Sequence, residues 1–593
     1  MTKTVGTWIL FFTLCLSNGF GQTSSFTKGK ITNSKNLYRE NMFIHYNAPV
    51  LLTGEYLYYS IYSINAKMKE LSTFSKIGYV ELIGEDTNVI FKHKIKLTDG
   101  LGQGEFFIPV TVSSGSYKLI GYTQWMKNSG KNYFFQADIG IINPFKNNQE
   151  SILKHIEIAQ INTGPDSNIP DVIGVRENTP PLSLKPNKKI FQKRNLAHLN
   201  INVHEKNMIQ GNYSISIRKM DSIEGPLTLN AQEYIISQDK ENIGDKKTLS
   251  GQMYLPELRG ELISGKIIPK EANFPLIEEK LALSIPGEQF VLKLSRTDKK
   301  GAFYFNLNQE YKNSHASIQI LGKNKNNYRI QLNKQSAVNY DDLIFKTFTI
   351  TPKMKNLILE RSVYNQVENA FAEMKPDTIQ YKDAIVPIYR KFSNVYNLDD
   401  YTRFSTIRET VSEIIEHVWV QRSTDGEDVF QVRGDEDTTD SNFLPLVTVD
   451  GMLIQNHGDV IDFNARKLKK ISISRSECVI NSITYKGVIA IETIEGDFFE
   501  GFKKDYITTI ELFPPLTAKK YFHQEYNAET KSTTQQIPDF RQQLLWLPQL
   551  ILESDKTKID FFTSDVAGKY EICLEGFTSK GNPISVKETF MVE

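Results

Sequence analysis

The stretch PLVTVDGMLIQNHGDVIDFNARKLKKISISRSECVINSITYKGVIAIET, from Pro445 to Thr493, decides the fold of the second half of the chain. It contains an apolar strand, a tight turn at Asp450 and Gly451, a second strand, and a third strand with a Gly-Val-Ile pattern. Glycine adopts a positive φ without strain at a Cβ atom, so an Asp-Gly pair between apolar runs predicts a hairpin. We therefore expect a small sheet that buries one face through these side chains: Val447, Val449, Ile471, Ile473, Val488 and Ile491.

Two amphipathic segments precede this stretch and predict helices. In ERSVYNQVENAFAEMK, apolar residues recur at helical spacing until Pro376 ends the pattern, namely at Val363, Val367, Ala370, Phe371 and Met374. In STIRETVSEIIEHV, Ser405 is a candidate N-cap, and the apolar stripe consists of Ile407, Val411, Ile414, Ile415 and Val418. Their polar faces carry mixed charges, so we expect both helices, 360–374 and 407–418, to pack on the sheet and not on a membrane surface.

The same stretch resembles the plug domain of TonB-dependent outer-membrane receptors. The residues that carry the resemblance are Val449, Asp450 and Gly451 after the first strand, LKKISISR at 468–475, and Gly487, Val488 and Ile489 in the last strand. The resemblance implies a small α+β plug-like domain. Receptor barrels need many strands of about 9–11 residues, and the residues after Thr493 are too few for them. We therefore expect a plug-like domain without a barrel.

The first half of the chain alternates short apolar runs with turn residues, which is typical of an all-β sandwich. Four stretches cover almost all of 37–146 and resemble the macroglobulin-type β-sandwich domain: YNAPVLLTGEYLYYSIYSI, SKIGYVELI, GLGQGEFFIP and GSYKLIGYTQWMKN. Covalent trapping in that family needs a Gly-Cys-Gly-Glu-Gln thioester motif, which the sequence lacks. The resemblance therefore implies the fold and not the trapping chemistry.

The remaining boundaries follow from composition and resemblance. Several prolines and few apolar residues predict a linker over 147–190, followed by a β-sandwich over 191–250. A sandwich over 251–350 is similar to carboxypeptidase-regulatory repeats, the helices and the plug-like domain occupy 351–515, and 516–593 resembles the closing β unit of exported bacterial macroglobulin-like proteins. The predicted fold class is mainly β: tandem macroglobulin- or Ig-like sandwiches plus a small α+β plug-like domain.

Charge and hydropathy restrict the partners. The chain has 70 Lys and Arg against 69 Asp and Glu, so its charge attracts neither nucleic acid nor an anionic membrane. Lys3, the apolar run WILFFTLCL and the small residues Gly19 and Gly21 predict a signal peptide over 1–21. The rest of the sequence contains no apolar run of about 18 residues, so we expect no transmembrane segment in the mature chain.

The sequence gives no positive sign of catalysis, a cofactor or a metal site. Cys478 and Cys573 remain after export; one disulfide between them is an alternative to two buried thiols. Glu413 and His417 fall on one predicted helical face, where an ion pair is the ordinary interpretation. The acidic loop 434–442 has carboxylates that suit calcium, although a solvated loop is favoured and the EF-hand pattern is absent.

These features favour a non-catalytic exported protein of the cell envelope. It would bind an outer-membrane or periplasmic protein through its sandwiches and plug-like domain, and reside in the periplasm or at the outer membrane, including the cell surface. The alternative is a macroglobulin-type protease inhibitor or substrate-capture protein without the thioester.

Export gives the first testable prediction. Cleavage after Gly21 should leave a mature chain that begins at or near Gln22, because small residues occupy the −3 and −1 positions. Amino-terminal sequencing of protein purified from its native cells measures this directly. An intact Met1 terminus in the cytoplasmic fraction would contradict export.

Overall fold

The computed structural model describes residues 38–147, 149–150, 152–153, 181–221, 223–241, 253–287, 290–333, 337–380, 392–434, 443–480, 483–526 and 536–593. The predicted signal peptide and all but the first residue of the acidic loop 434–442 lie outside these ranges. Strands account for 44% of the described residues and helices for 13%, and all but one pair of the strands belong to four sets of sheets. The predicted class, mainly β with tandem sandwiches, is confirmed.

The first sandwich lies within the range expected from the sequence. One sheet has the order β1-β3-β6, formed by Glu40–Tyr46, Tyr56–Asn65 and Leu101–Phe107. The other has the order β2-β8-β7-β4-β5, formed by Val50–Leu52, Phe135–Ile142, Gly115–Tyr122, Ile77–Gly84 and Val89–Lys96. Alternation along β1 directs Met42 and Ile44 towards Gly121 of the facing sheet. The two inner faces form one core.

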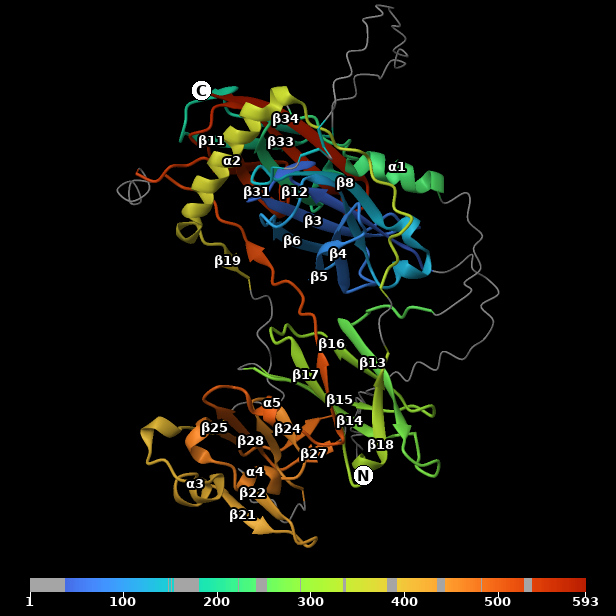
Figure 1. The fold of residues 1–593 in the computed structure, drawn as a ribbon, viewed down its shortest axis with the longest axis vertical. Helices are drawn as coiled ribbons and strands as arrows, with labels where there is room; N and C mark the ends of the chain where they lie inside the picture. The colour runs from blue at the N-terminus through green and yellow to red at the C-terminus, as the bar shows by residue number, and fades with distance from the viewer. Residues whose placement is uncertain are drawn as a thin grey trace, which may run out of the picture. The chain divides into compact units, whose positions relative to one another are not determined.

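The second sandwich joins two distant parts of the chain. Its smaller sheet has the order β32-β11-β9, formed by Lys556–Phe562, Leu196–Val203 and Leu182–Pro186. Its larger sheet has the order β10-β34-β33-β12-β31, formed by Ile190–Phe191, Pro583–Val592, Gly568–Phe577, Asn212–Lys219 and Gln543–Ile551. In Figure 1 the red strands β33 and β34 lie beside the green strand β12, as their pairing requires.

This arrangement differs from the expected boundaries 191–250 and 516–593, because both ranges contribute strands to the same two sheets. Strands β10, β11 and β12 alone cannot close a core around Tyr213, Ile215 and Ile217, which are all buried. The expected linker 147–190 also contains β9 and the first residue of β10. Pro186 is accommodated because β9 is the edge strand of its sheet. An edge strand has no neighbour on one side, so a residue without an N–H can be placed there without loss of a hydrogen bond between strands.

The third sandwich is also completed by a late strand. The first sheet has the order β16-β13-β18, formed by Ala302–Leu307, Glu261–Pro269 and Tyr328–Leu332. The second has the order β15-β14-β17-β29, formed by Val291–Arg296, Lys280–Ile285, His315–Ile320 and Ile507–Glu511. Strand β29 follows the predicted plug-like domain in sequence, so that domain is an insertion within the third sandwich.

The plug-like unit, residues 392–505, contains the mixed sheet expected from the opening stretch. Its order is β20-β25-β28-β23-β24, formed by Asn394–Asn397, Leu468–Ser474, Val488–Thr493, Leu446–Val449 and Met452–Ile454. The remaining elements are the hairpins β21-β22 (Val418–Arg422, Asp428–Val432) and β26-β27 (Cys478–Ile480, Ile483–Tyr485), with α3 (Ile407–Glu413), α4 (Gly458–Ile461) and α5 (Phe498–Gly501). Five of the six predicted apolar positions share one core with Ile407, Val411 and Ile415. Val488 belongs to a second cluster with Leu446 and Ala282.

The first of the two predicted helices packs elsewhere. Helix α2 (Lys355–Ala370) belongs to a cluster with Val50 and Ile142 of the first sandwich and with Phe348, which follows the third sandwich's strand β18. It does not belong to the plug-like core. Its buried residues are Ile358, Arg361 and Ser362, whereas Val363 is 55% exposed and Met374 56%. The predicted stripe is therefore not the buried face, since Val363, Ala370 and Met374 are exposed and Val367 and Phe371 are half-buried. The buried side of α2 combines apolar Ile358 with the ion-paired Arg361.

The second predicted helix is shorter than expected. Helix α3 ends at Glu413, and its N-cap is Thr406, whose hydroxyl accepts a hydrogen bond from the Glu409 N–H, so Ser405 is not the cap. His417 has a φ of 64° and precedes strand β21, so it does not share a helical face with Glu413.

Two further elements complete the architecture. Helix α1 (Ala231–Glu241) follows β12. Strands β19 (Thr378–Ile379) and β30 (Lys519–Lys520) flank the plug-like unit in the sequence and pair with each other. None of the helices in the described ranges has the length and apolar character needed to cross a membrane.

The Asp450-Gly451 turn gives a prediction with an internal control. Asp450 and Gly451 have φ values of 48° and 81° and join β23 to β24, as a type I′ hairpin requires. A Cβ atom on Gly451 would lie 2.1 Å from Phe290, whereas one on Gly426, with a φ of 84°, would meet nothing within 4 Å. Both alanine substitutions add backbone strain of roughly 1–2 kcal/mol, but only Gly451→Ala adds a clash.

Hydrogen exchange of β23 and β24 in the intact chain should therefore rise more in Gly451→Ala than exchange of β21 and β22 rises in Gly426→Ala. Equal effects at the two turns would mean that Phe290 moves aside freely.

Candidate functional site

A cavity of about 460 Å³ lies beside strand β1. Its walls come from β1 and the loop after it, from β12, β33 and β34 of the second sandwich, and from the residues that begin α1. The polar side chains among its lining are His45, Tyr46, Asn47, Ser216, Arg218, Lys219, Asp221, Thr228, Asn230, Glu233, Arg361, Glu571, Cys573, Glu575 and Lys587. Its volume is within the range of small-molecule sites, about 300–1,000 Å³.

Strand alternation explains why these polar groups gather. On β33, Tyr570, Ile572 and Leu574 are fully buried in the core of the second sandwich. The intervening Glu571 and Cys573 therefore lie on the opposite face, with Glu575. Register then brings their neighbours beside them, Arg218, Ser216 and Ser214 from β12 and Thr589, Lys587 and Ser585 from β34. The outer face of this sheet is thus polar where it meets the cavity.

A serine–histidine pair is buried next to the cavity. Nδ1 of His45 lies 2.6 Å from Oγ of Ser214, and the Tyr62 hydroxyl donates to the same oxygen at 2.9 Å. Sequence reasoning missed this pair because the two residues are 169 positions apart and carry no local motif. Burial, with a smaller effect of Lys587, lowers the pKa of His45 to about 3, which leaves the ring neutral at ordinary pH.

This pair lacks the access that catalysis needs. Ser214 is completely buried, and the Ser214 and Tyr62 hydroxyls also lie within hydrogen-bond distance of the backbone carbonyl of Glu575. A serine without solvent contact cannot meet a substrate, so the pair stabilises the packing of β1 on β12, and Tyr62 adds a contact from β3.

Burial also alters the protonation of Cys573 and Glu575 in the cavity. Burial raises the pKa of the Cys573 thiol well above its usual range, and it raises the pKa of Glu575 to about 7. The Glu575 carboxylate accepts from the Ser585 hydroxyl at 2.6 Å and from the Ala231 N–H at 3.0 Å, and the thiol lies 3.7 Å from its Oε1. A protonated thiol is a poor nucleophile. The cavity therefore presents polar surface without an activated nucleophile.

Cys478 and Cys573 form no disulfide with each other in the described part of the chain. Cys573 lies at the cavity, whereas Cys478 is buried in an apolar cluster with Leu446 and Val488. This result does not support the disulfide that the sequence left open.

A buried ion cluster closes one end of the cavity. Arg361 of α2 donates from Nε and a terminal nitrogen to the two Glu55 oxygens at 2.7 and 2.6 Å, and it also pairs with Asp221. Arg218 contacts Glu55 at 3.2 Å. Burial alone would raise the pKa of Glu55, but the two arginines outweigh it and hold the pKa near 2. This cluster fixes α2 on the first sandwich.

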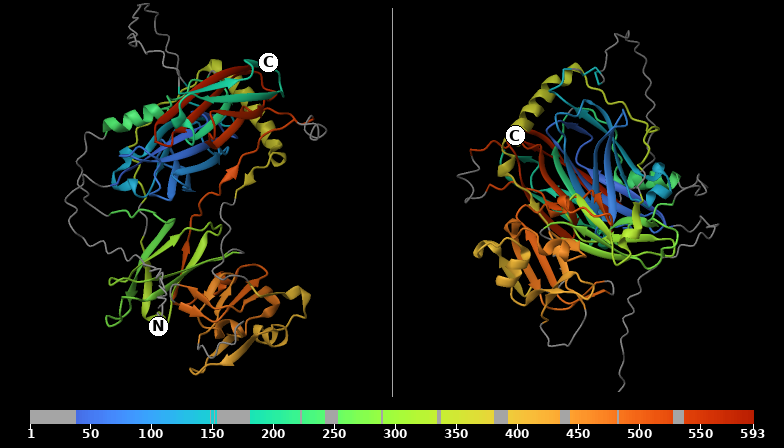
Figure 2. Two further views of the ribbon diagram at one scale, coloured as in Figure 1. Left: turned by 180° about the vertical axis from the view of Figure 1, so that it is seen from behind. Right: turned by 60° about the horizontal axis from the view of Figure 1, so that its bottom comes forward.

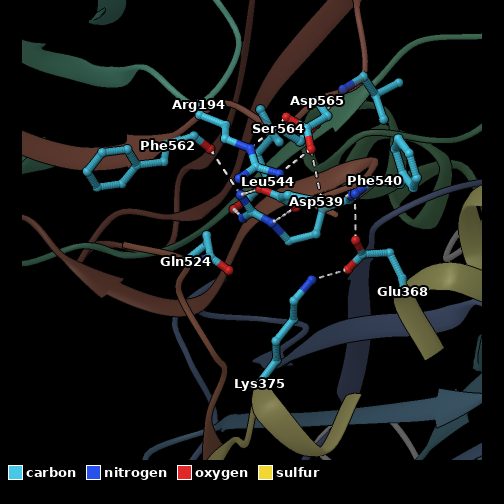
Figure 3. Close-up of polar contacts among 12 residues, drawn as sticks. Arg194, Glu368, Lys375, Gln524, Asp539, Phe540, Leu544, Phe562, Ser564 and Asp565 are labelled. Carbon is cyan, nitrogen blue, oxygen red and sulfur yellow. Dashed lines mark hydrogen bonds and ion pairs between the residues drawn. The ribbon is translucent and has the colours of Figure 1, made fainter. Parts of the chain in front are cut away.

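A second polar network joins the C-terminal segment to α2, as Figure 3 shows. Arg541 makes two hydrogen bonds to Asp539 at 2.6 and 2.7 Å, and Arg194 makes two to Asp565 at 2.7 and 2.6 Å. Glu368 accepts from the Phe540 N–H and pairs with Lys375. Burial opposes ionisation of Asp539, but Arg541 outweighs it and lowers the pKa of that carboxyl. The network is structural, because each charge already has its partner.

The residues of the predicted plug motif lie on two adjacent strands and the turns next to them. Strand β23, which ends at Val449, runs parallel to β28, and Val447 pairs with Ile489 while Leu446 pairs with Val488. Gly487 precedes β28 with a φ of 85°. The Asp450 carboxylate accepts hydrogen bonds from the N–H and hydroxyl of Thr493 at 2.7 and 2.6 Å and from the Phe498 N–H at 3.1 Å. The motif thus has a structural role, and its assignment to the receptor-plug family stays a prediction.

Within the described residues, no group of three or more His, Cys, Asp or Glu side chains could hold a metal ion. The carboxylates proposed for calcium in 434–442 lie outside those residues.

Comparisons with known proteins identify no family. No family model and no curated protein matches the chain. Among solved structures, Salmonella alpha-2-macroglobulin reacted with methylamine is 8% identical over 94% of this chain and 39% of that one, with a TM-score of 0.22. Native Escherichia coli alpha-2-macroglobulin is 9% identical over 94% and 40%, with a TM-score of 0.23. The Escherichia coli adhesin FdeC is 8% identical over 52% and 63%, with a TM-score of 0.13.

The chain thus spans about two fifths of the length of the macroglobulins that it matches. These TM-scores are too low for the likeness to carry an inference about function.

The network in Figure 3 gives a stability prediction. Asp539→Asn would leave the buried Arg541 without its counter-charge, which should destabilise the second sandwich by about 3–5 kcal/mol. Asp560→Asn is the control, because its pair with His198 is exposed and worth no more than about 1 kcal/mol. Chemical unfolding can be followed through Trp546 of β31 in a Trp125→Phe, Trp419→Phe background.

The pH dependence supplies a second readout of the same variant. The folded-state pKa of Asp539 is lowered, so its contribution is present above about pH 4, the ordinary value, and is lost as the pH falls through the folded value. Asp539→Asn should therefore lose less stability on acidification than the native chain. A variant with unchanged stability and unchanged acid sensitivity would contradict the role of the pair.

Proposed function

We propose that this chain is a non-catalytic exported protein of the bacterial cell envelope that binds a protein partner. The observation that carries the proposal is the outward apolar stripe of α2. Leu359 and Val363 are 47% and 55% exposed, and Ala370, the last residue of the helix, is also exposed. Their spacing of four and seven residues places them on one helical face.

The stripe lies on the side of α2 away from its anchor. Arg361 and Ile358 hold the opposite face on the first sandwich, and in Figures 1 and 2 the helix lies at the outer edge of the strands that it covers. An exposed apolar row on one helix suits a partner protein with an apolar groove, into which residues at i, i+4 and i+11 insert.

The buried nucleophiles support a binding role over a catalytic one. Ser214 has no solvent access, and the thiol of Cys573 is held protonated beside Glu575. The proposal that the chain is exported rests on the signal-peptide features of residues 1–21 in the sequence. The plug-like resemblance favours a partner in the periplasm or at the outer membrane.

The alternative is a macroglobulin-type inhibitor or capture protein. Its support is the sequence resemblance over 37–146, a range that folds as the first sandwich. Without a thioester, such a protein would retain a protease only non-covalently. Incubation with a panel of proteases, followed by gel filtration, distinguishes this function, because it requires co-elution after cleavage of the chain.

The experiment for the main proposal uses the mature full chain as bait for detergent-solubilised envelope proteins of its native cells. Leu359→Glu with Val363→Glu should reduce recovery of the partner at least tenfold, because a charge in an apolar groove is desolvated without a counter-ion. Gln366→Glu is the matched control, since it adds a charge at an exposed position beside the stripe.

A partner retained equally by all variants would contradict binding through α2. Hydrolysis of a peptide or glycan panel by the purified chain, abolished by one point substitution, would contradict the non-catalytic role.

A further inference from the structure

The start of helix α1 forms one wall of the cavity. Thr228, Leu229, Asn230 and Glu233 line it, and α1 contacts β1, β33 and β34. Asn230 and Glu233 form a reciprocal cap, in which each side chain accepts a hydrogen bond from the other residue's N–H at 2.9 and 3.0 Å. The wall is therefore an ordered helix end and not a loose loop.

One contact ties this helix end to the floor of the cavity. The N–H of Ala231 donates to Oε2 of Glu575 on β33 at 3.0 Å, and both residues are buried, with Ala231 at 0% and Glu575 at 3% exposure. One turn later, the Tyr234 ring packs 5.6 Å from Phe43 and 5.7 Å from Phe135. Aromatic packing and this carboxyl contact thus help to hold α1 in place.

We propose that α1 is a proton-controlled latch over this cavity, held closed while Glu575 is protonated and loosened when Glu575 ionises. A carboxylate enclosed by α1, β33 and β34 has exchanged water for only a few donors, and burial of its charge is unfavourable. Outward movement of α1 returns water to the carboxylate. Ionisation therefore favours the open position.

The direction of the pH dependence follows from the linkage between proton binding to Glu575 and the equilibrium of closed and open forms. Burial raises the pKa of Glu575 to about 7 in the closed form, whereas a hydrated glutamate has a pKa of about 4.3. Between these values the closed form holds more protons than the open form. The ratio of closed to open form thus falls as the pH rises through this window, by up to about tenfold per pH unit, and levels off above pH 7.

The other groups around Glu575 do not supply this transition. Burial keeps His45 of β1 neutral, with a pKa of about 3, and it raises the pKa values of Cys573 on β33 and Tyr62 on β3. Lys587 of β34 has a raised pKa and pairs with Glu571, and Arg218 of β12 pairs with Glu55. Glu233 of α1 is engaged in the helix cap.

Hydrogen exchange of α1 in the full mature chain, between pH 5 and 8 and corrected for intrinsic exchange, tests the latch. Protection of the amides that follow Tyr234 should fall at least tenfold from pH 5 to 7 and then level off. Glu575→Gln should keep α1 protected and remove the pH dependence. Glu257→Gln is the matched control, because it alters another buried glutamate with a raised pKa, near 8, that contacts Tyr79 instead of α1.

Ser585→Ala gives an independent variant if Glu575→Gln does not fold. It removes a donor to the ionised carboxylate, so the transition should move to higher pH. Protection of α1 that is constant between pH 5 and 8, or a pH dependence that persists in Glu575→Gln, would overturn the proposal. Neither result depends on whether a partner binds α2.

Discussion

The pairing of β12 with both β31 and β33 is the constraint on which the rest of the structure depends. A strand from the first half of the chain lies between two strands from its last fifty residues, antiparallel to both. Everything between β12 and β31 must therefore leave the second sandwich and return to it. The third sandwich is inserted in this way, and the plug-like unit is inserted within the third sandwich, between β17 and β29.

Ion pairs connect segments that are distant in the sequence at the places where the chain comes back to the first two sandwiches. Arg361 of α2 binds Glu55 and Asp221. Arg541 binds Asp539 just before β31, and Arg194, just before β11, binds Asp565, which follows β32. Buried charges destabilise a fold unless their geometry is nearly ideal, so they favour one register over its neighbours more than they add net stability. Apolar contacts supply the core, and these bidentate pairs select how distant segments meet.

The sequence predicted what is encoded locally. Period-two alternation identified most strands, and the Asp450-Gly451 pair identified its hairpin, because both depend on near neighbours. It did not predict the partner of β12, since pairing across more than 300 residues leaves no local pattern. The face of α2 was assigned wrongly because its buried side combines Ile358 with the ion-paired Arg361 and leaves out the apolar stripe that contains Val363. The Ser214–His45 contact and the cavity were missed for the same reason, since they exist only after the sheets have packed.

The split second sandwich also has a consequence for how the chain is made. Strands β9 to β12 leave the ribosome early, but their inner face has no partner until β31 to β34 have been synthesised. Closing such a long loop is slow, and unpaired strand edges promote aggregation in the meantime. The first sandwich can fold on local contacts, whereas the second remains an open sheet throughout the synthesis of two inserted domains. A chaperone that shields β12 during this interval would therefore determine the yield of the native protein.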